Sequence, residues 1–146
     1  IDGDLITERI TEGESKGCTW TSEGWVSPWN KWEHCFDFDS TGTQQITKNG
    51  DIWPLEVGKS ESYEITGKDQ WQSWISIRIC EVKSVVLVSI KEKQYPAYEV
   101  ECKTMGGEQL RYTSTYYISP ELQRIIKFKK RSTGRGSPVD YVAALE

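Results

Sequence analysis

Residues able to do chemistry are few in this chain, and they do not form a known catalytic motif. The only histidine is His34, and no G-x-S-x-G segment surrounds a serine nucleophile. Two acidic pairs, Asp37 with Asp39 and Glu99 with Glu101, each place two carboxylates on one face of a strand. Such pairs act as acid and base when a suitable distance separates them. An exposed strand face explains them more simply, so we predict no enzyme and no catalytic residues. A hydrolase of unknown type that uses His34 or these pairs is an alternative.

The four cysteines are well separated in the sequence, at Cys18, Cys35, Cys80 and Cys102. None belongs to a C-x-x-C pair, and structural zinc sites normally draw on closely spaced ligands, so we predict no metal site. An even number of separated cysteines favours disulfides and an oxidising compartment. Of the three connectivities we favour Cys18–Cys35 and Cys80–Cys102, because each closes a local segment and successive strands tend to be neighbours. The alternative is four reduced, buried cysteines in a cytosolic protein.

Tryptophan is unusually frequent, with seven Trp in the chain, and four of these residues lie close together near the N-terminus. An indole face can stack on the C–H face of a sugar, while polar neighbours such as Asn30 and Glu33 bind hydroxyl groups. The sequence therefore predicts a surface that binds a protein or a glycan. Its residues are Trp20, Trp25, Trp29, Trp32 and Asn30. The alternative is that most of these indoles form a small core around a Cys18–Cys35 disulfide.

Charge and hydropathy argue against two kinds of partner. The net charge is −4 and the sequence pI is near 5.2. A mildly acidic chain has no general attraction for phosphate backbones, so we predict no nucleic-acid partner. No stretch approaches the roughly 18 apolar residues that span a membrane, so we predict no transmembrane segment. Nothing in the sequence calls for a cofactor.

The elements that must position these residues are strands. Alternation with a period of two recurs along the chain, while helical periodicity hardly appears. The expected strands lie within 4–11, 32–38, 44–48, 60–66, 71–80, 85–90, 98–103, 110–118, 124–130 and 139–145. Residues 17–30 are rich in Trp, Ser, Gly and Pro and are expected to form an irregular loop. The apolar run 85–90 is expected to be a central strand buried on both faces.

Turn signals separate these strands. Asn49-Gly50 is the strongest hairpin signal in the chain. Ser119-Pro120 resembles a helix start but is too short to continue, so we expect one helical turn at most. The fold class is mainly β: an antiparallel meander curled into a barrel, half-barrel or sandwich. We expect residues 1–146 to form a single β domain, in which a Trp-rich subregion, 1–50, packs on the sheet of 51–146.

Three motifs carry a resemblance to a known type of domain. They are W-P-L-x-x-G-K-S at 53–60, Y-x-V-x-C at 98–102 and Y-Y-x-S-P-E-L-x-R-x-x-K at 116–127. With these motifs and Cys80, the chain resembles a bacterial exported domain found in lipoproteins and in secreted proteins of unassigned role. The resemblance implies export, and it supplies no catalytic residues.

Some such domains resemble the half-barrels of lipoprotein carriers, so a second reading is a carrier of a lipid or other apolar ligand in a half-barrel cavity. The candidate lining residues are Ile75, Ile77, Ile79, Val86, Val88, Tyr112, Tyr116 and Ile126. The main expectation remains a monomeric, non-enzymatic bacterial module that is periplasmic, cell-surface or secreted. Because the chain begins at Ile1, a leader or a lipid anchor upstream stays open.

Overall fold

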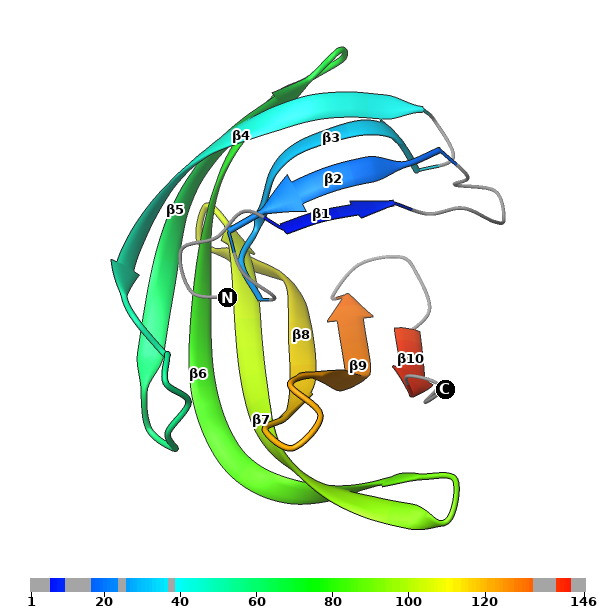
Figure 1. Ribbon diagram of the computed structural model, residues 1–146. Helices are drawn as coiled ribbons and strands as arrows, with labels where there is room; N and C mark the ends of the chain where they lie inside the picture. The colour runs from blue at the N-terminus through cyan, green and yellow to red at the C-terminus, as the bar shows by residue number, and fades with distance from the viewer. Residues whose placement is uncertain (1–5, 10–16, 24–25, 37–38, 133–138, 143–146) are drawn as a thin grey trace. The chain divides into compact units, whose positions relative to one another are not determined.

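The computed structural model describes residues 6–9, 17–23, 26–36, 39–132 and 139–142, and within them the regular elements are all strands (Figure 1). The strands are β1 Ile6–Arg9, β2 Thr19–Ser22, β3 Trp29–Cys35, β4 Ser40–Gly50, β5 Ser60–Asp69, β6 Ser73–Ile90, β7 Lys93–Gly106, β8 Gln109–Ser119, β9 Arg124–Ser132 and β10 Val139–Val142. Hydrogen-bonded neighbours follow the chain order from β1 to β10. The prediction of an all-β antiparallel meander is therefore confirmed.

The chain divides into two compact units. The first consists of residues 1–47 and 63–76, and the second of residues 48–62 and 77–146. The strands β4, β5 and β6 contribute residues to both units. The expectation of a single domain, with 1–50 packed on the sheet of 51–146, stays a prediction.

Both expected disulfides are present. Cys18 is joined to Cys35 in the first unit, and Cys80 to Cys102 in the second. Cys80 and Cys102 stand directly opposite each other on β6 and β7, and both are fully buried. Each disulfide thus links elements that are close in sequence, which is why the local pairing could be chosen from spacing.

The region 17–30 is not wholly irregular, as its composition had suggested. It contains β2, and β3 already begins at Trp29. Trp20 pairs with Trp32, and Thr21 with Lys31. A four-residue strand without aliphatic residues carries too little periodicity to be recognised, and its hydrogen bonds are formed with the neighbouring strands β1 and β3.

The Asn49-Gly50 hairpin is a second wrong prediction. β4 continues through Asn49 to Gly50, and residues 51–59 form the connection to β5. Gly50 has a φ of 82°, and a Cβ there would lie 2.9 Å from the carbonyl oxygen of Ser60. Glycine is therefore required at this strand end by its backbone conformation and by the close approach of the neighbouring strand, not by a two-residue turn.

The segments 71–80 and 85–90 belong to one long strand instead of two. β6 runs from Ser73 to Ile90, with a register shift against β7 between Val82 and Ser84. Only one face of its last part is covered, because Val85 and Leu87 are 53% and 63% exposed. The expectation that this run is buried on both faces is therefore wrong. A run of apolar residues does not reveal whether a second layer covers it.

The buried face of this run contributes to one core cluster of the second unit. The cluster consists of Val88, Ile90, Tyr95, Ala97, Tyr117 and Ile126, with Val86 and Leu122 packed against it. Leu122 arrives there from the turn 120–123 between β8 and β9. Its backbone N–H donates a 3.0 Å hydrogen bond to Oγ of the buried Ser119. The S-P-E-L motif is therefore a tight turn whose leucine anchors it to the core.

Candidate functional site

Three parallel rings form the most distinctive surface feature of the first unit. Trp20 and Trp29 stack with centroids 4.8 Å apart and planes inclined by 14°. Phe36 lies 5.9 Å from Trp29 at an angle of 15°. The two indoles are half-buried and Phe36 is 47% exposed. We call Trp20, Trp29 and Phe36 the aromatic row.

Pairing between β2 and β3 explains how the row is assembled. Trp20 is opposite Trp32 and Trp29 is opposite Ser22, which places both row indoles on the same sheet face. Glu33 is opposite Thr19 and lies on the other face. Glu33 is therefore not positioned to bind a ligand of the row, although the sequence suggested it as a polar neighbour.

Two further indoles, the buried Trp32 and the half-buried Trp74, lie next to the row. Trp32 is buried against the Cys18–Cys35 disulfide, and it stacks on Trp74 with centroids 5.8 Å apart. Its Nε1 donates a 2.8 Å hydrogen bond to Oγ of Ser40. A tryptophan that is buried with its N–H satisfied internally is a structural residue. The alternative of a small core around the disulfide thus holds for Trp32, and Trp20, Trp29 and Trp74 pack against this core as partly buried residues.

Gln44 forms hydrogen bonds both to Trp74 and to Trp29 of the row. Its Oε1 accepts a 2.9 Å hydrogen bond from Nε1 of Trp74, and its Nε2 donates a 2.7 Å bond to the backbone oxygen of Trp29. Both ends of the amide are engaged, so the position of Trp29 depends on that of Trp74. Sequence reasoning missed Gln44, Trp74 and Phe36, because their contacts come from tertiary neighbours rather than from a local pattern.

The row indoles differ from Trp32 and Trp74 in their polar atoms. Within the described part of the chain, no group accepts a hydrogen bond from the ring nitrogen of Trp20 or Trp29. Half-buried indoles of this kind combine an apolar face with an available donor. Of the predicted site residues, the structure thus brings together Trp20, Trp29 and Trp32, while Trp25 lies outside the described residues.

Asn30 occupies an irregular position next to the row. The register between β2 and β3 shifts here, so that Thr21 pairs with Lys31 and Ser22 with Trp29. Asn30 is the extra residue of this bulge, and bulges commonly redirect side chains. Its Oδ1 is buried and has no hydrogen-bond partner among the residues that the structure describes. A buried acceptor left unsatisfied is uncommon and calls for an explanation.

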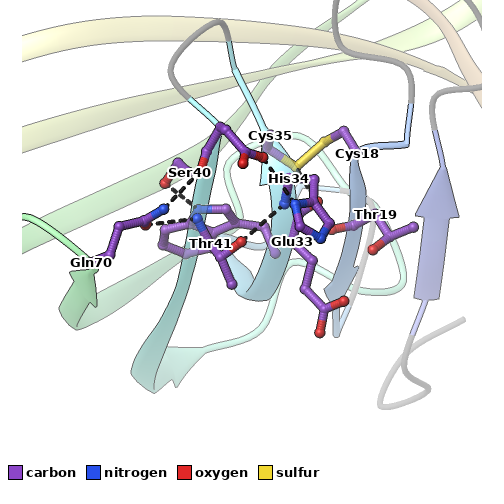
Figure 2. Close-up of polar contacts among 10 residues, drawn as sticks. Cys18, Thr19, Glu33, His34, Cys35, Ser40, Thr41 and Gln70 are labelled. Atoms are coloured by element: carbon purple, nitrogen blue, oxygen red, sulfur yellow. Dashed lines mark hydrogen bonds and ion pairs between the residues drawn. A yellow bond between two sulfur atoms is a disulfide. The ribbon is translucent and has the colours of Figure 1, made fainter.

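The connection between β3 and β4 presents Phe36 in a constrained backbone. His34, Phe36 and Asp39 have φ values of 54°, 66° and 53°, which non-glycine residues rarely adopt. Gln70 holds the connection, since its Oε1 accepts from the Thr41 N–H and its Nε2 donates to the Asp39 oxygen. Figure 2 shows these contacts beside the Cys18–Cys35 disulfide. Strained backbone of this kind is frequent at functional sites.

His34 forms a contact with Asp39. Its Nδ1 lies 2.9 Å from Oδ1 of Asp39, and both side chains are largely exposed. Nucleophilic catalysis would also require a hydroxyl or thiol bonded to the other ring nitrogen. No such group is present among the residues that the structure describes. Asp37, the other half of this acidic pair, lies outside them.

The second acidic pair lies in β7. Glu99 and Glu101 are half-buried, and Glu101 has Nζ of Lys103 at 3.8 Å. Glu101 is also directly opposite Glu81 on β6, which itself has Nζ of Lys83 at 3.5 Å. These carboxylates form part of a mixed-charge strand surface. Among the described residues there is no group of three or more His, Cys, Asp or Glu side chains that could hold a metal ion.

The residues proposed to line an apolar cavity do not share a face. Ile77 and Ile79 are exposed, whereas Val88 and Ile126 belong to the buried core of the second unit. Alternation along β6 directs its odd- and even-numbered residues to opposite sides. The grouping of these residues on one face was therefore wrong.

No helix of the described residues is long and apolar enough to cross a membrane. A comparison of the chain with protein-family models, with curated proteins and with solved structures found no match in any of the three.

Proposed function

We propose that this chain is an exported bacterial, non-enzymatic module that binds a protein or a glycan through the aromatic row. The observation that carries the proposal is the division among the tryptophans. Trp32 donates its N–H to Ser40 and Trp74 donates its N–H to Gln44, whereas the described residues leave those of Trp20 and Trp29 without an acceptor. Packing alone explains the first two indoles. Trp20 and Trp29 also pack against the Cys18–Cys35 cluster, but their ring N–H groups are left for a ligand to accept.

The two disulfides support the exported location. Disulfides persist in oxidising compartments, and cytosolic proteins rarely contain structural ones. Both are buried within their units and leave no free cysteine. They are compatible with a periplasmic, cell-surface or secreted protein, and the resemblance to bacterial exported domains narrows the expected source.

The test compares two kinds of tryptophan variant. Trp29→Ala removes the central ring of the row, while Trp71→Ala removes an exposed tryptophan outside it. Immobilised wild-type and variant proteins would be exposed to fractionated envelope and extracellular proteins and polysaccharides, and bound material would be quantified. We expect a bound component that is lost with Trp29→Ala and retained with Trp71→Ala. Equal binding by all three proteins would refute the proposal.

A further inference from the structure

We infer that the ligand of the aromatic row is a neutral saccharide, an inference that rests on the proposed function. The exposed surface of the aromatic row is small. A fully exposed aromatic side chain offers about 150–250 Å², and the three partly covered rings together offer on the order of 200 Å². A standard protein interface needs about 800 Å² from each partner. The described row is therefore sized for one or two sugar rings rather than for a protein.

The row also offers hydrogen-bond donors. A pyranose has an apolar C–H face surrounded by hydroxyl groups that both donate and accept. Trp20 and Trp29 stack on each other, so each covers part of the other's face. The row keeps the exposed remainder of its half-buried rings together with ring N–H donors that no described group uses. Asn30, in the adjacent bulge, has its amide oxygen buried and does not contribute it to the surface. The partly exposed rings and the unused donors match the apolar face and the hydroxyl rim of a sugar.

The strand positions around the row supply no positive charge. Those that share its face in β2, β3 and β4 include Ser22, Trp32 and Gly42, which carry no charge, and the position opposite Trp20 in β1 is the acidic Glu8. Lys31 is opposite Thr21 and Thr43, so it lies on the other face, as does Glu33. An acidic sugar would therefore find no cation supplied by these positions. The surface favours a neutral sugar.

The experiment uses defined soluble oligosaccharides as probes. Neutral β-linked glucose, galactose, mannose and N-acetylglucosamine oligomers are titrated against the protein, with oligouronates as the acidic comparison. Binding is measured by calorimetry and by intrinsic tryptophan fluorescence. We expect binding of at least one neutral series, an affinity loss of about tenfold in Trp20→Ala, and no change in Trp71→Ala. Trp20→Phe keeps a stacking ring without the N–H, so its affinity should fall between wild type and Trp20→Ala.

The outcomes separate this inference from the proposed function. Thermal unfolding of each variant verifies that it is folded, and Trp20→Phe serves if Trp20→Ala is not. If no saccharide binds but a protein ligand is lost with Trp29→Ala, the saccharide inference is wrong and the binding module stands. If oligouronates bind as well as neutral oligomers, the argument from charge is wrong. If neither saccharide nor protein binding depends on Trp20 or Trp29, both proposals are refuted.

Discussion

Nζ of Lys48 lies 3.3 Å from Oε2 of Glu61, a carboxylate that is 1% exposed and that also accepts the backbone N–H of Ile52 at 3.2 Å. Lys48 itself is 29% exposed. The pair joins the end of β4 to the start of β5 and holds the connection between them. Because the carboxylate is buried and the ammonium is not, loss of the lysine is the more damaging change.

We predict that Lys48→Met lowers the free energy of unfolding by about 2–3 kcal/mol, because the buried Glu61 carboxylate loses the Lys48 ammonium. The measurement is urea denaturation at neutral pH. Lys31→Met is the matched control, since the Lys31–Glu33 pair is 3.2 Å long but 58% and 46% exposed. It should cost less than about 1 kcal/mol. Equal losses in the two variants would contradict the role of burial.

The same pair predicts a dependence of stability on alkaline pH. Burial alone would lower the pKa of Lys48, but Glu61, with Asp51, outweighs it and raises the pKa above its ordinary value. A raised pKa gives stability that is complete below the unfolded value of about 10.4 and is lost as the pH rises through the folded value. Urea denaturation from pH 8 to 11.5 should show that the difference in unfolding free energy between wild type and Lys48→Met narrows above about pH 10.4. A difference in unfolding free energy that stays constant over this pH range would argue against the ion pair.

Asp69 predicts the opposite dependence, at acid pH. The N–H of Trp71, with those of Gln72 and the hydroxyl of Ser40, lowers the pKa of this carboxyl. A lowered pKa gives stability that is present above the unfolded value of about 3.9 and is lost as the pH falls through the folded value. We expect Asp69→Asn to reduce the slope of unfolding free energy against pH below about pH 4. An unchanged slope would mean that the pKa of Asp69 is the same in the folded and the unfolded protein.

Gly42 should not tolerate a side chain. A Cβ at this position would meet the ring of Trp32 and lie 2.5 Å from the backbone oxygen of Lys68. We expect Gly42→Ala to lower the free energy of unfolding by about 1–3 kcal/mol, because the buried indole would have to move. Thr43→Ser, on the exposed face of the same strand, should stay within about 0.5 kcal/mol of wild type. Thermal or urea unfolding would measure both, and a neutral Gly42→Ala would show that Trp32 can shift freely.

Both disulfides should be fully formed in the protein and should stabilise its fold. Cys80 and Cys102 close a segment with a sequence separation of 22, for which chain entropy predicts about 3 kcal/mol. The double variant Cys80→Ala/Cys102→Ala should lose about that amount in urea denaturation. Thiol titration of the wild-type protein, denatured without reductant, should label no cysteine. Labelling of all four would remove the support for export.

The alternation of side chains determined the fold class, because a period of two is a local property that each strand displays by itself. Disulfide pairing also followed from the sequence, since each bond joins residues within one local hairpin-like segment. The boundaries were less predictable. β2 was missed because its hydrogen bonds are supplied by β1 and β3, and Asn49-Gly50 was misjudged because a turn signal competes with the pairing of β4 and β5.

The sequence by itself determined that this is an antiparallel β protein with two disulfides and a concentration of indoles near Cys18 and Cys35. Only the tertiary structure decided which indoles are buried and which remain available. Trp32 and Trp29 look alike in the sequence, yet one donates to Ser40 in the interior and the other stacks in the aromatic row. The physical reason is that burial depends on register and on neighbours such as Trp74 and Gln44, which are distant in the chain.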